Sequence, residues 1–335
     1  MQPFRKMISL FAVLAGLGTG VAGAENLRLG DFQSTTHIVS IEGTTHWMKE
    51  VEAATKGQIA FQHFPSEQAA KASALLDAVN NGILDAALIG PSYHSETLRM
   101  NSVVDLPGFY GSAAQGTDSL QKMLAEGPLR DELLESGVVP VFGFVLPPYQ
   151  MLSAKGLNKK TDFGGMDIRT SGSTQAMTAR SLGGNGISMP GPEVYTAVET
   201  GRLDAVMFPL ASVPAYNLQE VARHISRNGS FGGYSFILVL RRDLFEGLSP
   251  EIQSAMIEAG KETAAHVAKA QDDAIASMVA DWTAKGVEVY DFSADELAAQ
   301  QASMQQVSAD WVKRIGRDSD TAKSVLATYA SLNGK

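Results

Sequence analysis

Apolar and polar positions in the first part of the chain follow two alternating patterns. Runs rich in β-branched and aromatic residues are followed by stretches in which apolar residues recur at helical spacing. This predicts strands at 26–32, 58–64 and 84–89 and helices at 39–54 and 67–80. Such alternation is typical of an α/β fold with largely parallel sheets. In sheets of this kind ligands bind beyond the carboxyl ends of the strands.

The middle of the chain repeats the alternation. Further elements are predicted as follows: strands at 138–146, 166–170, 203–208 and 234–240, and helices at 173–182 and 192–200. Two groups of strands predict two lobes, with the chain crossing between them near 145–150 and 232–235. The expected lobes are 25–146 with 235–273, and 147–234 with 274–335. Two lobes joined by several segments form a hinge that closes over a ligand.

A long helix is predicted next. Ser249 and the following proline cap its start, and Gly286 ends it. Apolar residues recur in it every three or four positions over about eight turns. A helix of this length is long enough to span two lobes. The apolar stripe is typical of core packing rather than of a cofactor site. A short strand at 287–290 follows, and a capping-box pattern at Ser293 opens a final helix that carries Trp311.

Residues 1–24 have the pattern of a secretory signal peptide. Arg5 and Lys6 form its charged part, 7–17 its apolar part, and Ala24 ends a small-residue cleavage site. The apolar run has about half of the roughly 20 residues that a membrane-spanning helix needs. We therefore expect an exported, soluble chain, and removal of Arg5 and Lys6 takes its formal net charge from −9 to −11.

Composition excludes several classes of protein. The 335 residues are 44% hydrophobic and 19% charged, which is too apolar for intrinsic disorder and too long for one core. The chain has no cysteine, which excludes disulfides, thiolate metal sites and cysteine nucleophiles. Its acidic balance disfavours nucleic acid, because phosphates bind to clustered Lys and Arg.

Residues typical of catalysis are sparse. The six histidines show no metal-binding spacing, and the sequence has no nucleophile elbow and no Walker loop. We therefore expect no enzyme, no metal and no cofactor. The competing hypothesis is a secreted enzyme whose site is built from Asp31, His37 and His94.

Arg169 is the strongest candidate for a binding residue on physical grounds. It lies at the end of a short predicted strand, and Ser171, Gly172 and Ser173 follow where a helix is predicted to begin. A guanidinium beside a helix N-terminus forms an anion site and holds a carboxylate through two charge-assisted hydrogen bonds. The alternative is a structural arginine paired with a neighbouring carboxylate.

Two sequence blocks carry a resemblance to a known family. They are DFGGMDIR at 162–169 and EVYTAVETGRLDA at 193–205, with Pro209 after the second. In this order they resemble the substrate-binding proteins of tripartite ATP-independent periplasmic (TRAP) transporters, of the DctP-like family. The resemblance implies a two-lobed periplasmic binding protein fold. It also implies that Arg169 binds the ligand's carboxylate between hinged lobes, and that a membrane partner imports the ligand with an ion gradient.

Positions that often carry polar groups in acid-binding members of that family are aromatic in this chain. They are Phe32, Tyr93, Tyr149 and Phe208, and Tyr149 stands where some members have a second arginine. Such rings stack on a planar ligand or surround a cationic nitrogen, although ordinary packing also accounts for them. Asp31 would pair with that nitrogen, a layout similar to ectoine-binding members. The alternative for Asp31 is a solvated or helix-capping carboxylate.

These features favour a small monocarboxylate, zwitterionic or aromatic, over a dicarboxylate or a large sugar acid. A sulfonate also fits the anion site at Arg169. Arg241 or Arg242 would add a second cation only if the fold brings one of them close to Arg169. We expect a periplasmic monomer that delivers its ligand to TRAP membrane subunits, with a sensory partner as the alternative. Because a strand-end arginine fills no core, Arg169→Ala is expected to remove affinity and leave the fold intact.

Overall fold

The computed structural model describes residues 24–156 and 162–335. The predicted signal peptide therefore lies outside the described residues, except for its last residue, Ala24. In chain order the strands are β1 (Glu25–Asp31), β2 (Ile59–Phe64), β3 (Ala86–Ile89), β4 (Val138–Val145), β5 (Gln150–Ser153), β6 (Asp167–Thr170), β7 (Asn185–Ser188), β8 (Ala205–Phe208), β9 (His224–Ser226), β10 (Ser235–Arg241) and β11 (Glu288–Tyr290).

Helices cover the faces of the sheets. The α-helices are α1 (His46–Ala54), α2 (Leu75–Asn80), α3 (Ala113–Ala125), α4 (Pro128–Glu135), α5 (Ser173–Ser181), α6 (Val194–Glu199), α7 (Leu218–Val221), α8 (Arg242–Gly247), α9 (Pro250–Ala284), α10 (Ala294–Met304), α11 (Val307–Ile315) and α12 (Ser319–Leu332). The short π- and 3₁₀-helices are η1 (Ser40–Thr45), η2 (Ala72–Ala74), η3 (Pro91–His94), η4 (Met100–Asp105), η5 (Gly191–Glu193), η6 (Leu210–Ser212), η7 (Pro214–Tyr216) and η8 (Gly316–Asp318).

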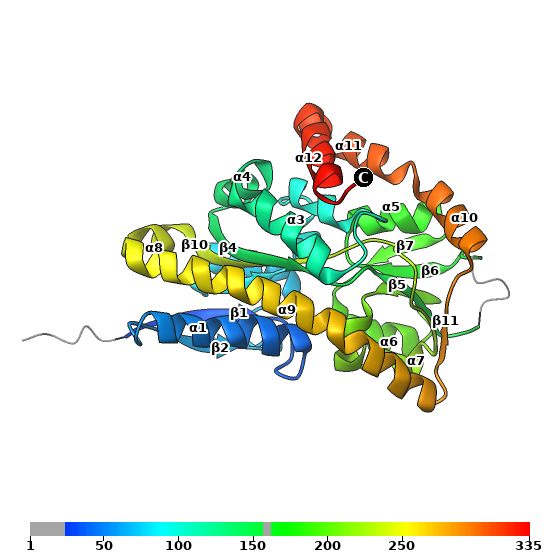
Figure 1. Cartoon of the computed structure of the whole chain (residues 1–335), viewed down its shortest axis with the longest axis horizontal. Helices are drawn as coiled ribbons and strands as arrows, with labels where there is room; N and C mark the ends of the chain where they lie inside the picture. Colours follow the sequence, from blue (N-terminus) through cyan, green and yellow to red (C-terminus); the bar gives the residue numbers. More distant parts are fainter. Residues whose placement is uncertain (1–23, 157–161) are drawn as a thin grey trace, which may run out of the picture.

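Two β-sheets form the centres of two lobes (Figure 1). The first sheet has the strand order β2-β1-β3-β10-β4 and the second has the order β11-β9-β5-β8-β6-β7. In the first sheet β10 is antiparallel to both of its neighbours, whereas β1 is parallel to β2 and β3. In the second sheet β5 is antiparallel to both neighbours, whereas β6 is parallel to β7 and β8.

The expectation of largely parallel sheets is therefore wrong, since both sheets are mixed. The two strands that run against their neighbours are the first ones after each crossing, β5 on the way into the second lobe and β10 on the way back. Each arrives from the opposite lobe rather than through a covering helix, so no right-handed crossover forces it to be parallel. The crossings themselves lie where the sequence predicts them.

The long helix α9 joins the two lobes, as the sequence predicts (Figure 1). Its 35 residues extend about 52 Å at 1.5 Å per residue. The Ser249 hydroxyl accepts a hydrogen bond from the Ile252 N–H at its start. Met256 and Val267 belong to the core of the first sheet, whereas Trp282 belongs to the core of the second. One helix therefore contributes side chains to both cores.

Three helix predictions differ from the structure. The helix predicted at 39–54 begins as the π-helix η1 before α1, and the one predicted at 67–80 is restricted to η2 and α2. Ser66 and Glu67 take positive φ angles of 55° and 60°, which a right-handed helix excludes. The predicted final helix is divided into α10, α11 and α12. Gly316, at φ 75°, separates α11, which carries Trp311, from α12.

The C-terminal helices lie beside both lobes. Helix α11 contacts α5 of the second lobe, whereas α12 contacts α3 and η4, which the predicted boundaries place in the first lobe. Figure 1 shows these two helices above α3 and α5. The lobe boundaries stay a prediction, and these contacts favour moving α12 to the first lobe.

Candidate functional site

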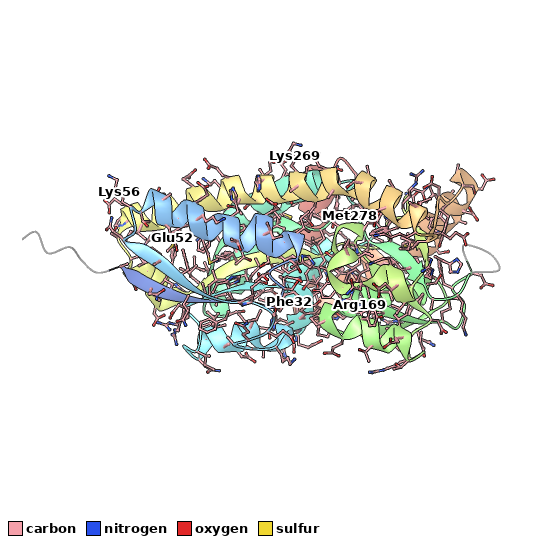
Figure 2. The ribbon with its side chains drawn as sticks, turned by 90° about the horizontal axis from the view of Figure 1, so that it is seen from below. Phe32, Glu52, Lys56, Arg169, Lys269 and Met278 are labelled. Carbon is pink, nitrogen blue, oxygen red and sulfur yellow. The ribbon has the colours of Figure 1, made fainter. Side chains whose placement is uncertain are left out.

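The candidate residues come together where strands of both sheets end. Asp31 ends β1, Phe208 ends β8, and Arg169 is the third residue of β6. Tyr93 lies in η3 directly after β3, and Tyr149 lies between β4 and β5. Figure 2 shows Phe32 and Arg169 facing each other at the junction of the lobes. The carboxyl ends of β1, β3, β6 and β8 therefore meet at this junction, and ligands of such sheets bind beyond strand ends of this kind.

Arg169 is a buried cation with uncharged partners. Its side chain is among the largest fully buried ones, and the residue is 1% exposed. Its Nε and Nη2 donate to the Met189 carbonyl at 3.0 and 2.9 Å, and its Nη1 donates to the Met207 carbonyl at 3.1 Å. Within the described ranges the arginine has no carboxylate partner, so the alternative of a structural ion pair does not apply there. A buried positive charge of this kind favours an anionic ligand.

Tyr93 connects Arg169 to the opposite lobe. Its hydroxyl oxygen accepts a hydrogen bond from the Gly191 N–H at 3.1 Å and a long one from Arg169 Nη2 at 3.5 Å. Because the oxygen accepts from both groups, its own O–H remains available as a donor. Tyr93 and Arg169 thus offer two donors from different lobes to one anion.

Aromatic rings surround the guanidinium. The Arg169 side chain lies 5.0 Å from the centre of the Phe208 ring, in cation–π geometry. Phe32 packs edge-on against Tyr93 at 5.6 Å, and Tyr149 lies 6.3 Å from Phe208. All four predicted aromatic residues therefore lie within one connected cluster.

Sequence reasoning missed three further rings in this cluster. Tyr234 contacts Tyr93 and Tyr149, Phe236 stacks on Phe32 at 5.5 Å, and Tyr216 meets Phe208 edge-on at 5.6 Å. Tyr234 and Phe236 lie at the start of the strand predicted at 234–240, and that prediction could have pointed to them. Tyr216 lies in the short helix η7, which the sequence pattern did not predict.

Asp31 is fully buried and is bonded within its own lobe. One carboxylate oxygen accepts a hydrogen bond from the Gln33 N–H at 2.8 Å, and the other accepts one from the Thr44 hydroxyl at 2.9 Å. Both oxygens are thus used to hold the turn after β1 and the π-helix η1. The alternative of a solvated or helix-capping carboxylate is therefore wrong, because Asp31 is buried and its oxygens hold a turn and the Thr44 side chain rather than a helix N-terminus.

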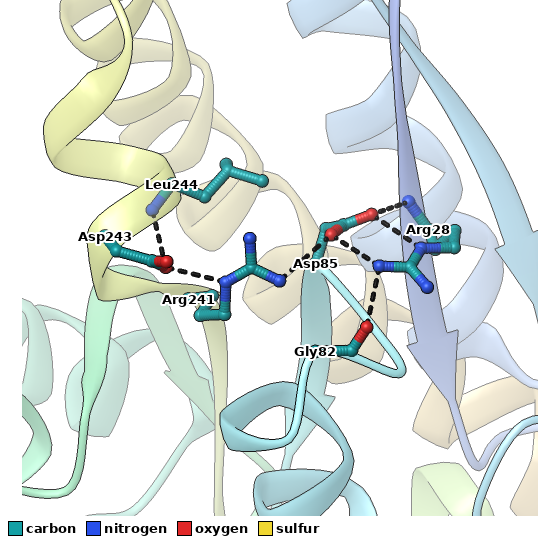
Figure 3. A network of polar contacts seen from close by, with 6 residues as sticks. All are labelled: Arg28, Gly82, Asp85, Arg241, Asp243 and Leu244. Carbon is teal, nitrogen blue, oxygen red and sulfur yellow. Dashed lines mark hydrogen bonds and ion pairs between the residues drawn. The ribbon is translucent and has the colours of Figure 1, made fainter.

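The cations considered as a second charge are engaged elsewhere. Arg241 pairs with Asp85 and with Asp243, and Asp85 also binds Arg28, as Figure 3 shows. Arg242 pairs with Glu246. Strand β10 starts beside the aromatic cluster and carries Arg241 at its far end, about 20 Å away at 3.4 Å per residue. Neither arginine therefore reaches the Arg169 site.

A cleft of about 480 Å³ opens beside the clamp. Its walls are formed by 92–97 of the first lobe and by 171–173 and 188–190 of the second. Tyr93 and Met189 line it and are hydrogen-bonded to Arg169, which itself is buried behind them and does not line the cleft. Its volume lies in the range of small-molecule sites.

Two absences concern the described part of the chain only. It contains no group of three or more His, Asp or Glu side chains arranged to hold a metal ion. Nor does any helix in 24–156 or 162–335 have the length and apolar character needed to cross a membrane.

Comparison with known proteins identifies the family. A model described as bacterial extracellular solute-binding protein, family 7 (DctP), matches residues 30–314. The chain belongs to this family. Proteins with similar sequences include the 2,3-diketo-L-gulonate-binding periplasmic protein YiaO of Escherichia coli strain K12. It is 27% identical over 94% of this chain and 95% of the relative.

Solved structures of TRAP solute-binding proteins have the same fold as this family 7 chain. One, from Rhodoferax ferrireducens with copurified benzoate, has a TM-score of 0.86 at 20% identity and covers 93% of this chain and 98% of that one. Another, from Bordetella bronchiseptica with bound mandelate, has a TM-score of 0.83 at 22% identity, with coverages of 92% and 99%. The two-lobed fold and the TRAP family resemblance are therefore confirmed. By its description the family consists of bacterial extracellular solute-binding proteins.

Proposed function

We propose that this family 7 protein captures a small aromatic monocarboxylate between its lobes and delivers it to TRAP membrane subunits. The observation that carries the proposal is the buried Arg169 guanidinium, which has carbonyl and phenol partners and lies over the Phe208 ring. A carboxylate compensates this charge through charge-assisted hydrogen bonds, while the rings contact the apolar body of the ligand.

The charge of the site favours one carboxylate rather than two. Tyr149, where some relatives have a second arginine, is buried, and burial raises the pKa of its phenol well above the ordinary value. It therefore stays neutral. Since Arg241 and Arg242 are engaged with carboxylates elsewhere, a second acidic group would meet no second cation in the described site.

Aromatic acids are favoured over zwitterions. Asp31, the carboxylate considered for a ligand ammonium group, is fully buried, and each of its oxygens accepts a hydrogen bond from a protein group of its own lobe. The benzoate and mandelate found in two proteins of the same fold support this choice as precedents. A benzenesulfonate offers the same planar body and a single anion, so it remains a candidate ligand.

The test is a ligand-binding screen on the mature protein, unfolded and refolded to remove any ligand carried from the host. Benzoate, mandelate, benzenesulfonate, succinate, glucuronate and a betaine are compared by thermal unfolding and then by calorimetry. A ligand at about a hundred times its Kd adds roughly 2.7 kcal/mol of stability. We expect this gain for the aromatic monoanions alone. A gain confined to succinate or glucuronate would contradict the proposal.

The transport role is tested separately from binding. We propose that the signal peptide directs the chain to the periplasm, where it acts as a monomer. Uptake of the labelled ligand should be lost when the genes for the TRAP membrane subunits are deleted. Unchanged uptake with a lost transcriptional response would support the sensory alternative. Conversion of the ligand during incubation would support the secreted enzyme.

A further inference from the structure

His37 offers an unused hydrogen-bond donor inside the molecule. The residue follows β1 and is fully buried at 0% exposure. Its Nδ1 accepts a hydrogen bond from the Val39 N–H at 3.0 Å. Because Nδ1 is the acceptor, the proton of the neutral ring lies on Nε2. Within the described ranges the buried Nε2 has no hydrogen-bond partner.

The ring is neutral in the protein. Burial lowers the pKa of His37 to about 4, although the negative charge of Asp31 acts in the opposite direction. At neutral pH the residue therefore presents one N–H group and no charge. A buried donor without an acceptor is unfavourable, which makes an acceptor from outside the chain the simplest way to satisfy it.

His37 and Arg169 contact the same group of aromatic rings. Its ring meets the Tyr216 ring edge-on at 5.5 Å, and Tyr216 in turn meets Phe208 at 5.6 Å. The Arg169 guanidinium lies 5.0 Å from Phe208 on the same cluster of rings. Tyr216, from the second lobe, is also hydrogen-bonded to Gln33 of the first. His37 and Arg169 thus flank one aromatic wall formed by Phe208 and Tyr216.

We propose that the Nε2–H of His37 donates a hydrogen bond to an oxygen substituent on the body of the ligand, so that the site selects hydroxylated aromatic monocarboxylates over unsubstituted ones. This inference rests on the proposed function. The carboxylate binds Arg169 and Tyr93, and the ring lies against the wall. The substituent then reaches the side of the wall on which His37 lies.

The test compares benzoate, 3-hydroxybenzoate and 4-hydroxybenzoate by calorimetry in the wild-type protein and in His37→Asn. The asparagine Oδ1 can still accept the Val39 N–H, as in an Asx turn, but the side chain places no donor at the position of Nε2. We expect the wild-type protein to bind one hydroxybenzoate about fivefold to tenfold more tightly than benzoate. In His37→Asn that preference should fall to within about twofold.

The matched control is His46→Asn, because His46 lies on α1 and stacks on His266 outside the aromatic cluster. This variant should keep the wild-type preference. Equal affinity for all three acids in the wild-type protein, or an unchanged preference in His37→Asn, overturns the role of His37 alone. Binding of mandelate or benzenesulfonate but of none of these three acids also overturns the role of His37 alone. Binding of no aromatic monoanion at all overturns the proposed function itself.

A second measurement needs no variant. The proton on His37 Nε2 should give a slowly exchanging signal in proton–nitrogen NMR spectra, because the atom is buried. We expect this signal to move downfield when hydroxybenzoate replaces benzoate. An identical signal with both ligands would mean that the donor meets an internal water, and would overturn the proposal even if His37→Asn failed to fold.

Discussion

The burial of Arg169 changes what its removal is expected to do. Its three bonds to the Met189 and Met207 carbonyls stabilise the second lobe itself. Truncation to alanine would leave these buried acceptors unpaired and create a cavity, at a cost of about 2–4 kcal/mol of folding free energy. The expectation that Arg169→Ala leaves the fold intact therefore does not follow from this geometry.

Arg169→Lys is the more informative substitution. Lysine keeps the charge and much of the volume but loses the planar, two-pronged donor. We expect the affinity for the aromatic acid to fall by about 2–3 kcal/mol, since charge-assisted bonds to the carboxylate are lost, and the melting temperature to fall less than in Arg169→Ala, since the ammonium group still donates to a buried carbonyl. Calorimetry and thermal unfolding measure the two effects.

The exposed Arg180 at the end of α5 provides the matched control, and Arg180→Lys should alter neither quantity. If Arg169→Lys binds as tightly as the wild-type protein, the guanidinium does not hold the ligand.

Phe208 contacts the Arg169 cation, and in the proposed function it also contacts the ligand. Phe208→Leu keeps most of the buried volume, so we expect stability to fall by less than about 1.5 kcal/mol. The ring face is lost, and binding of an aromatic acid should weaken by about 0.5–1.5 kcal/mol. Calorimetry with benzoate checks this, and an affinity equal to that of the wild-type protein would return Phe208 to a packing role.

Residue chemistry could be predicted from the sequence only in part. Arg169 was proposed because its neighbours match a family block and because a guanidinium beside a helix N-terminus forms an anion site. The donor on His37 was not predicted from the sequence. The tautomer of His37 depends on the Val39 N–H, and its burial depends on Tyr216 from the other lobe. Such properties arise from contacts between residues far apart in the chain.

Elements with strong local signals were predicted well. Helix α9 has a hydroxyl cap, an apolar stripe and a terminal glycine, and the capping box at Ser293 is present as expected. The start of α2 was not predicted correctly, because the left-handed backbone at Ser66 and Glu67 is fixed by tertiary contacts. The Ser66 N–H donates to the Gln33 carbonyl, in the turn after β1. Mixed sheets were also missed, because strand direction depends on which lobe the chain comes from.

Strands β1 and β10 are tied to the residue before β3 by a charged network (Figure 3). Asp85 accepts hydrogen bonds from the Arg28 side chain and N–H at 2.9 Å, and it lies 3.5 Å from Arg241. Burial by itself would raise the pKa of Asp85, but the bonds from Arg28 and the charges of both arginines outweigh it. The net effect holds the pKa below its ordinary value.

This network predicts a pH dependence of stability. A carboxylate whose pKa is lower in the folded state stabilises the fold above its unfolded pKa, and this contribution is lost as the pH falls below about 4. Asp85→Asn should therefore lower the free energy of unfolding by about 1–2 kcal/mol at pH 7 and by less at pH 3. Urea unfolding at the two pH values measures the difference.

Asp118→Asn is the control, because Asp118 forms an exposed pair with Lys122 within α3. Its effect should stay below about 0.5 kcal/mol at both pH values. A loss for Asp85→Asn that is the same at pH 3 and pH 7 would show that the charge of Asp85 is not what joins these strands.

At the scale of the whole molecule, ligand binding depends on how closely the lobes meet. The lobes contact each other through the Tyr93 bond to Gly191, and through Gly172 against η3. A Cβ atom on Gly172 would lie 2.6 Å from the Ser92 carbonyl oxygen of the first lobe and 3.0 Å from the Ser95 hydroxyl. The backbone at Gly172, with φ −165°, is one that any residue adopts, so only the approach of the other lobe requires glycine.

Gly172→Ala should therefore act on closure rather than on either lobe. In an open arrangement the methyl group meets only solvent, and the loss of a glycine N-cap from α5 costs at most about 1 kcal/mol of folding free energy. In the closed arrangement the clash pushes the lobes apart and separates Tyr93 from Arg169, so we expect an affinity at least about tenfold weaker. X-ray scattering should show that the ligand compacts the wild-type protein more than the variant. Gly247→Ala, where an added Cβ meets no atom within 4 Å, should change neither measurement. Wild-type affinity and compaction in Gly172→Ala would mean that the ligand is bound without this contact between the lobes.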